Sequence, residues 1–396
     1  MKRLTLLLGA LLLAAAALAQ TAVPPTARIA HGPYLQNVTT DGFTVVWSST
    51  ADAAAWVELA PADGSHFYSA ERPKYYESHL GLRRIGRLHS VRVSGLAPGT
   101  TYRYRIMQQG VAVNEGNKRV ILDDGYGSEV FKRKPYTVTT LDPAQEKVGF
   151  WVVNDIHSRD SVFRLLIKDA PKAKPDFVCL NGDLASQTEN DQTLWNACLA
   201  SASELLSPAG VPLVVTRGNH ENRGAYAGHW SDFFSTPTGE TYYTFRCGPA
   251  FFIVLDGGED KPDSDIRYYG LGDWDAYRVQ QAEWLKGVVA SDEFRAAPVR
   301  IVLMHMIPGK KDSWYGEQQI RRLFAPELTG KGIDLMLCGH YHRYEWIDDG
   351  SRGVDFPILV NSNNDCLRVS ADAKGIDLRV VDTSGAVIKQ HRIDKK

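Results

Sequence analysis

Several features that would point to common protein classes are missing from this 396-residue sequence. Lysine and arginine form no long run, and 45 basic residues against 46 acidic ones leave a formal net charge of −1. A general electrostatic affinity for nucleic acid or anionic lipid therefore has no support. Internal repeats and low-complexity tracts are absent, and beyond the N-terminal segment no apolar stretch is long enough to span a bilayer.

Cysteine is also scarce, with five residues, an odd number. Cys179, Cys198 and Cys338 lie in apolar or helical stretches where a small hydrophobic residue would also serve, so buried free thiols are expected. Pairing of Cys247 with Cys366 in an oxidising compartment is the alternative. The length and the 44% hydrophobic content suit two domains that fold without cross-links.

The N-terminus has the three-part pattern of a secretory signal. Lys2 and Arg3 precede an apolar stretch over residues 4–18, and small residues allow cleavage after Ala19. This stretch is shorter than the ~20 residues of a membrane span, which disfavours the alternative of an uncleaved anchor helix. We therefore predict that residues 1–19 are a signal peptide and that the protein is secreted or periplasmic.

Residues 26–142 have the rhythm of a β-sandwich. Short, largely alternating segments are separated by Gly, Pro and Asp, at residues 42–47, 55–59, 89–93 and 101–106. The stretch SGLAPGTTYRY at 94–104 resembles the Leu-x-Pro-x-Thr-x-Tyr corner of fibronectin type III domains. The stretch HGPYLQN at 31–37, followed by Trp47, is similar to the opening of the N-terminal domain of purple acid phosphatases. Residues 108–135 fit less well and are interpreted as an inserted hairpin or loop.

After a linker at residues 141–144, apolar runs alternate with helical segments. Five runs lack polar alternation, which indicates strands covered on both faces, at residues 148–153, 177–180, 211–215, 301–304 and 335–338. Helices are expected at residues 160–169, 191–206 and 280–289. This alternation is typical of an α/β domain, here over residues 143–396.

Each of the five runs is followed by side chains that can bind metal ions: Asp155, His157, Asp183, Asn219, His305, His340 and His342. Because ligands of α/β sheets collect at the carboxyl ends of the strands, we expect these side chains to converge on one rim of one sheet. Seven ligands suit two ions with about four ligands each and one shared carboxylate, for which Asp183 is the candidate. A nitrogen and oxygen donor set without thiolate favours Fe, Mn or Zn.

The motifs resemble the signature of the calcineurin-like metallophosphoesterase superfamily: D-x-H, G-D, G-N-H-[D/E], a further His, and G-H-x-H. The resemblance implies a four-layer α/β sandwich, in which two mixed sheets are flanked by helices, preceded by a small all-β fibronectin III-like sandwich. It assigns one ion to Asp155, His157, Asp183 and His342. It assigns the other to Asp183, Asn219, His305 and His340. It also implies that His220 acts in catalysis rather than as a ligand.

The likeness to plant purple acid phosphatases is incomplete. Those enzymes use a tyrosinate ligand three residues beyond the G-D aspartate, where this chain has Ser186. They also lack the histidine that stands here as His157. The resemblance therefore does not imply a purple ferric-tyrosinate centre.

The chemistry that we predict is hydrolysis of a small phosphate ester, either a monoester or a diester. Two adjacent cations lower the pKa of a bridging water, the resulting hydroxide attacks phosphorus in line, and His220 is the candidate general acid for the leaving oxygen. Arg159, Arg217 and Arg343 stand beside the ligands in the sequence and are candidates either for contacts with phosphate oxygens or for ordinary ion pairs.

Two alternatives stay open. An extracellular binding or adhesion protein would use the sandwich for recognition and keep the metal centre as a structural element. A nucleotidase or cyclic-nucleotide phosphodiesterase would need the aromatic loops between the ligand strands to frame a base. Removal of the metal, reloading with single ions and assays on aryl phosphates would separate the enzyme from the binding protein.

Overall fold

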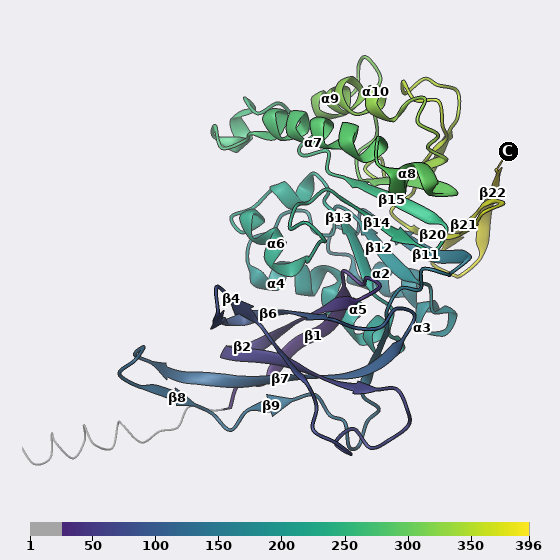
Figure 1. The fold of residues 1–396 in the computed structure, drawn as a ribbon. Helices are drawn as coiled ribbons and strands as arrows, with labels where there is room; N and C mark the ends of the chain where they lie inside the picture. Colours follow the sequence, from purple (N-terminus) through teal and green to yellow (C-terminus); the bar gives the residue numbers. More distant parts are fainter. Residues whose placement is uncertain (1–25, 396) are drawn as a thin grey trace, which may run out of the picture.

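The computed structural model describes residues 26–395, and Figure 1 shows a β-rich N-terminal region below a larger region of sheets and helices. In the N-terminal region, long strands enclose a core that includes Phe43, Trp47, Val91 and Tyr104. These strands are β1 (Ile29–Gln36), β2 (Gly42–Pro61), β6 (Ile85–Ser94), β7 (Thr101–Asn114) and β10 (Tyr136–Thr139). Short strands complete it: β3 (Lys74–Tyr76), β4 (Ser78–His79), β5 (Leu82–Arg83), β8 (Val120–Leu122) and β9 (Tyr126–Gly127).

Strand β2 is longer than the sequence indicates. Residues 42–47 and 55–59 were expected to be separate strands, and that expectation is wrong. A shift in register between Ser48 and Ala53 lets one continuous strand change partners. Its first half pairs with β1 and β6, and its second half pairs with β7 and β3. The hairpin predicted within residues 108–135 is confirmed, because β7 pairs back on β8 and β9.

Two sheets face each other in the α/β region. The first contains the parallel strands β11 (Lys147–Val153), β12 (Phe177–Asn181) and β13 (Leu213–Thr216), followed by the antiparallel strands β20 (Asp365–Asp372), β21 (Gly375–Asp382) and β22 (Val387–Asp394). The second has the order β14 (Tyr243–Cys247), β15 (Ala250–Leu255), β16 (Val299–Met304), β17 (Leu335–Cys338), β19 (Ile358–Val360) and β18 (Glu345–Ile347). Both sheets are mixed.

Helices cover the outer face of each sheet. On the first sheet they are α2 (Asp160–Ile167), α3 (Ala170–Ala173), α4 (Asp191–Leu194) and α5 (Ala200–Leu206), with a π-helical turn at Trp195–Leu199, and the short α6 (Trp230–Phe233) also joins this core. On the second sheet they are α7 (Trp274–Val289), α8 (Asp292–Ala296), α9 (Tyr315–Leu323) and α10 (Ala325–Leu328). Figure 1 shows the second group above the sheets.

The apolar runs are buried on both faces, as predicted. In β11, Phe150 and Val152 face the core between the two sheets, whereas Trp151 and Val153 pack against the helices of the first sheet. Such a strand needs no polar alternation. The result is the four-layer α/β sandwich with an all-β N-terminal domain that the resemblance implied.

One part of the sequence prediction is wrong. The five ligand-bearing strands do not belong to one sheet, because β11, β12 and β13 lie in the first sheet and β16 and β17 lie in the second. Apolar runs look alike in either sheet, so their sequences do not reveal the partition. The ligands therefore meet across the carboxyl edges of two packed sheets.

The N-terminal region is joined to the first sheet by a strand pair. Strand β1 runs parallel to β13, with Gln36 opposite Leu213, so the hydrogen-bonded order continues from one region into the other. The Tyr34 hydroxyl also donates to the carbonyl of Phe233 at 2.8 Å, and His31 stacks on Trp195 with ring centroids 5.0 Å apart. The joint therefore combines backbone pairing with side-chain packing.

The five cysteines are buried and free, so the alternative pairing of Cys247 with Cys366 is wrong. Within residues 26–395, the structure contains no helix that has both the length and the apolar character needed to cross a membrane. The predicted signal peptide, residues 1–19, lies outside the described residues.

Candidate metal centre

Six of the seven predicted ligands form two overlapping clusters of potential metal donors. One cluster contains Asp155, His157, Asp183 and His342, and the other contains Asp183, His305 and His340. In each cluster the donor atoms lie within 4.8 Å of one another. Asp183 belongs to both, which is the position of a carboxylate that bridges two ions. The seventh, Asn219, is buried between the end of β13 and His220.

The backbone at these positions is unusual. Ten residues other than glycine have a positive φ within the described chain, and five of them are predicted ligands: Asp155, His157, Asp183, His340 and His342. Such conformations cost of order 1–3 kcal/mol each and persist only where the surrounding structure enforces them. They concentrate at the carboxyl ends of β11, β12 and β17, where the chain turns sharply to aim its side chains at the centre.

Two motif glycines are required by close packing against the ligands. A Cβ atom on Gly218 would lie 2.3 Å from Asp183 Oδ1, and one on Gly339 would lie 2.6 Å from Asp155 Oδ2. Both separations are far shorter than any allowed contact. The glycines of the G-N-H and G-H-x-H motifs are therefore needed because they lack a side chain, which lets the backbone approach the carboxylates closely.

The donor atoms are left without ordinary partners, which fits a metal site. Asp155 Oδ1, Asn219 Oδ1 and His305 Nε2 are buried and have no hydrogen-bond partner. Buried polar atoms are rarely orphaned in proteins, and a bound ion is one of the standard explanations. His157 Nε2 also lies 3.1 Å from His342 Nε2, so two ring nitrogens point at the same space. These residues fit two ions bound by carboxylate, imidazole and amide groups.

The ring orientations of two histidines are fixed from outside the centre. His305 Nδ1 donates to the carbonyl of Asn181 at 2.7 Å, which leaves Nε2 facing Asp183 Oδ2 at 3.2 Å. His340 Nε2 lies 3.2 Å from Glu317 Oε1, a buried carboxylate on α9. A second partner of this kind selects the tautomer and orients the ring toward the metal.

The charges in the centre shift each other's pKa values strongly. Burial opposes ionisation of Asp155, but the charge of His305 and the nearby rings of His157 and His342 outweigh it and hold the pKa of this carboxyl well below its usual range. Burial likewise opposes protonation of His305, yet the carboxylates of Asp183 and Asp155 raise the pKa of His305 to about 10. The site therefore has a negative potential that favours cations.

Glu221 supports the loops that carry the ligands. Its carboxylate accepts hydrogen bonds from the backbone N–H groups of Asp183 at 2.8 Å, Leu184 at 2.7 Å and Gly218 at 2.7 Å. Burial, together with the charge of Asp183, raises the pKa of Glu221 to about 7. This residue ties the turn after β12 to the turn after β13 and contributes no donor to the two clusters.

His220 lies at the edge of the centre. Its Nδ1 donates to the carbonyl of Ser186 at 2.8 Å, and its Nε2 is 3.8 Å from Asp183 Oδ2. Burial lowers the pKa of His220, with Asp183 acting in the opposite direction. The ring is thus oriented with one nitrogen toward the shared carboxylate.

The three arginines that sequence reasoning selected all have protein partners. Arg159 donates to the carbonyls of Asp155 at 3.0 Å and Asn363 at 2.6 Å. Arg217 Nε pairs with Asp256 Oδ2 at 2.6 Å, and Arg343, which is largely exposed, pairs with Glu345. Their observed contacts are of the ion-pair and loop-bracing kind, the second of the two roles considered from the sequence.

Two neighbours of the centre were missed by sequence reasoning. Arg223 Nη1 lies 2.9 Å from His220 Nε2, and Glu317 touches His340. Arg223 follows the G-N-H-E motif by two residues, so its proximity in sequence was a usable signal. Glu317 carries no such signal, since it reaches the centre only because α9 packs over the second sheet.

The aromatic residues of the connecting loops are mostly packed rather than open. Trp230, Tyr242 and Tyr243 are buried, and Trp274 Nε1 donates to Asn222 Oδ1 at 3.1 Å. Tyr269 and Trp314 are exposed, and Trp314 ends the segment that leads from His305 to α9.

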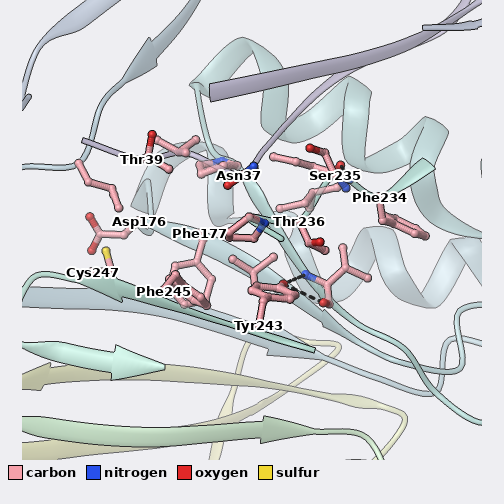
Figure 2. Close-up of a pocket in the computed structure, with 18 residues that line it drawn as sticks. Asn37, Thr39, Asp176, Phe177, Phe234, Ser235, Thr236, Tyr243, Phe245 and Cys247 are labelled. Carbon is pink, nitrogen blue, oxygen red and sulfur yellow. Dashed lines mark hydrogen bonds between the residues drawn. The ribbon is translucent and has the colours of Figure 1, made fainter. Parts of the chain in front are cut away.

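A separate pocket lies away from the centre. Figure 2 shows it between the turn after β1 and the starts of β12 and β13, with Phe177, Tyr243 and Phe245 at its base. Its volume is about 60 Å³, roughly the space of two water molecules. Since it opens at the amino ends of the parallel strands, opposite the ligands, it has no part in the metal site.

Comparisons with known proteins agree with this geometry. Residues 149–344 match the calcineurin-like phosphoesterase family, and residues 32–119 match the purple acid phosphatase N-terminal domain. The chain is 24% identical over 324 residues to purple acid phosphatase 18 of Arabidopsis thaliana, covering 76% of this chain and 62% of that protein. It is 25% identical over 231 residues to serine/threonine-protein phosphatase CPPED1 of Rattus norvegicus, covering 56% of this chain and 69% of that protein.

The fold is also found in a solved structure. Purple acid phosphatase PPD1 from yellow lupin (Lupinus luteus) seeds superposes with a TM-score of 0.64 at 17% sequence identity, covering 91% of this chain and 74% of that chain. At this identity the likeness concerns the fold. The two family matches, together with the paired donor clusters, show that this chain contains a calcineurin-like phosphoesterase domain, at residues 149–344, preceded by a purple acid phosphatase-type N-terminal domain.

Proposed function

We propose that the protein is a dinuclear metal-dependent hydrolase of small phosphate esters. The observation that carries this proposal is the pair of donor clusters that share Asp183. One ion would be held by Asp155, His157, Asp183 and His342, and the other by Asp183, Asn219, His305 and His340. When bound, two such ions supply a nucleophilic hydroxide at neutral pH and positive charge for the phosphate group.

His220 is the proposed general acid. The carbonyl of Ser186 can only accept, so Nδ1 of His220 carries a hydrogen. Nε2, which accepts from Arg223 Nη1 at 2.9 Å in this structure, is the atom that would take up and release a proton. Nε2 is directed toward the shared carboxylate, at the edge of the centre where a leaving oxygen would emerge.

Metal reloading tests the proposed activity. Protein stripped with a chelator and reloaded separately with Mn, Zn or Fe is assayed on 4-nitrophenyl phosphate and bis(4-nitrophenyl) phosphate. We expect activity to return with at least one ion, which also identifies the metal. Absence of activity with every ion on both substrates would instead favour a binding protein with a structural metal centre.

The role of His220 is tested by the leaving group. His220→Asn should lower kcat roughly 10²- to 10⁴-fold for an alkyl phosphate, whose poor leaving group needs a proton. The same variant should lose much less on 4-nitrophenyl phosphate, because 4-nitrophenolate leaves without one. An equal loss on both substrates, with bound metal unchanged, would exclude the acid role.

Localisation and domain limits are part of the same proposal. We propose that residues 1–19 are removed on export, and N-terminal sequencing of secreted protein should then begin at Gln20. Retention of Met1 in exported material would contradict this. We further propose residues 26–142 and 143–396 as the two domains.

A further inference from the structure

Arg223 holds a cationic group at the edge of the metal centre. Its Nη1 lies 2.9 Å from His220 Nε2, and the same His220 atom is 3.8 Å from Asp183 Oδ2. A single ring atom therefore separates the guanidinium from the carboxylate that both donor clusters share. The side chain is 23% exposed, so part of it is in contact with solvent.

The guanidinium is held rigidly by carboxylates on the neighbouring loop. Nε and Nη2 of Arg223 pair with the two oxygens of Glu259 at 2.5 and 3.0 Å, and Nη2 also contacts Asp260 Oδ1 at 3.2 Å. Glu259 is buried. Such a two-point pairing fixes the plane of the guanidinium. It leaves Nη1, whose contacts within the described chain are to the His220 ring, as the part of Arg223 that faces the centre.

Counting oxygens shows what this group distinguishes. A phosphate monoester has three terminal oxygens and up to two negative charges, whereas a diester has two terminal oxygens and one charge. Two metal positions can neutralise two terminal oxygens, which is the whole set of a diester. A third oxygen, present only in a monoester or in free phosphate, needs a donor from the protein. Of the arginines considered near the site, Arg223 is the one in contact with His220.

We infer that Arg223 binds the third terminal oxygen of a phosphate monoester and makes the site select monoesters over diesters. This inference rests on the proposed phosphoesterase function and adds its substrate class. Nη1 carries two hydrogens, so it can donate to a phosphate oxygen without leaving Glu259. A lysine would not reproduce the arrangement, since one ammonium group cannot keep the two-point pairing with Glu259 while reaching the substrate.

The test compares two substrates in the metal-loaded protein. Arg223→Gln should lower kcat/KM for 4-nitrophenyl phosphate roughly 10²-fold, the usual effect of removing one donor to a developing or resident anion. For bis(4-nitrophenyl) phosphate the loss should stay below about 10-fold. Arg223→Lys should recover only part of the monoester activity. Arg164→Gln removes a partly exposed arginine of α2 that pairs with Glu204 of α5, and it should change neither rate.

A binding measurement gives a readout independent of turnover. Calorimetry on the metal-loaded protein should show that Arg223→Gln weakens the binding of inorganic phosphate by a factor similar to the loss of monoester activity. Binding of dimethyl phosphate, which lacks a third terminal oxygen, should be unchanged. Glu259→Gln tests whether the pairing with Glu259 is what holds Arg223 in position, because it keeps the guanidinium but weakens its support. It should lower monoester activity by a smaller factor than Arg223→Gln and change diester activity little. An equal loss of activity on both substrates would show instead that Arg223 and Glu259 only brace their loops.

The outcomes separate this inference from the function on which it rests. If the wild-type protein hydrolyses neither substrate with any ion, the proposed function fails. In a second outcome, the wild-type protein is active while Arg223→Gln lowers kcat/KM equally for both substrates, or leaves the affinity for inorganic phosphate unchanged. In that case the proposed function stands, and the inference that Arg223 selects monoesters is wrong.

Discussion

Single residues around the candidate centre are constrained more by backbone geometry than by chemistry. Five of the predicted ligands adopt a left-handed conformation, and the motif glycines leave room for carboxylates that a methyl group would displace. The strain is stabilised by supports such as Glu221, which holds three backbone N–H groups. Small changes in volume at these positions should therefore disturb metal binding without removing any ligand.

Gly339→Ala tests whether a small increase in side-chain volume disturbs metal binding. The new methyl group would lie 2.6 Å from Asp155 Oδ2 and 2.9 Å from Asn154 Cβ, so the carboxylate must move. We expect loss of about 1–3 kcal/mol of stability and a metal content below two ions per chain, measured by plasma mass spectrometry. Gly287→Ala in α7 is the control, because a Cβ there meets nothing within 4 Å. It should stabilise the protein by about 0.4–1 kcal/mol and keep both ions. Equal metal content in the two variants would refute the packing explanation.

Glu317→Ala tests the support of His340 from α9. Without the carboxylate 3.2 Å from Nε2, the ring loses the partner that orients it, and metal affinity should fall roughly 10- to 100-fold. Competition with a fluorescent chelator measures this. Tyr341→Phe, which removes only the hydroxyl that donates to the other oxygen of Glu317 at 2.9 Å, should have a smaller effect. A folded Glu317→Ala protein with unchanged affinity would show that His340 needs no such partner.

The six side chains of the two donor clusters could be predicted to lie together because they stand in short motifs directly after apolar runs. The contacts of Arg223 and Glu317 could not. Arg223 reaches its position through a two-point pairing with Glu259, a residue of another loop, and Glu317 through the packing of a helix on the second sheet. Nothing local in the sequence indicates the approach of Glu317, and the spacing of Arg223 from the G-N-H-E motif places it near the centre without revealing which partners hold it. The partners that Arg159, Arg217 and Arg343 contact are also set by the tertiary structure and could not be predicted from the sequence.

Among the elements, strands were easier to predict than their arrangement. Unbroken apolar runs gave β11, β12, β13, β16 and β17 to within a few residues. Their division between two sheets did not follow, because a strand buried on both faces has the same composition in either sheet. The length of β2 was missed for a related reason. Its shift in register sits in a polar stretch that reads as a break between two strands.

The helical segment from α4 to α5 provides an element-level prediction. Trp195 opens its π-helical turn, is fully buried, and packs against His31, Tyr34 and Phe233. Trp195→Ala should cost about 3–5 kcal/mol of unfolding free energy, measured by urea denaturation. Leu165→Ala on α2, where the leucine is largely exposed, should stay within about 0.5 kcal/mol. Similar urea-denaturation midpoints for the two variants would show that the π-helical turn is not a main contact between the N-terminal region and the α/β region.

For the whole molecule, thiol reactivity tests whether the five cysteines are buried and free. All five are buried, and burial raises the pKa values of Cys179 and Cys366 to about 12. Thiolates react and thiols do not, so a native sample at neutral pH should show almost no reaction with Ellman's reagent. In guanidinium chloride, five thiols per chain should titrate. A count of three or one in denaturant would reveal a disulfide and contradict the free state.

The pairing of β1 with β13 has a consequence for how the molecule moves. Many two-domain enzymes undergo hinge motion, in which the domains rotate about a flexible connecting segment. Here β1 pairs with β13 where Gln36 lies opposite Leu213, so the hydrogen-bonded order of strands continues from one region into the other. Rotation of the two regions about the linker would break this pairing, and we therefore expect them to move together as one body.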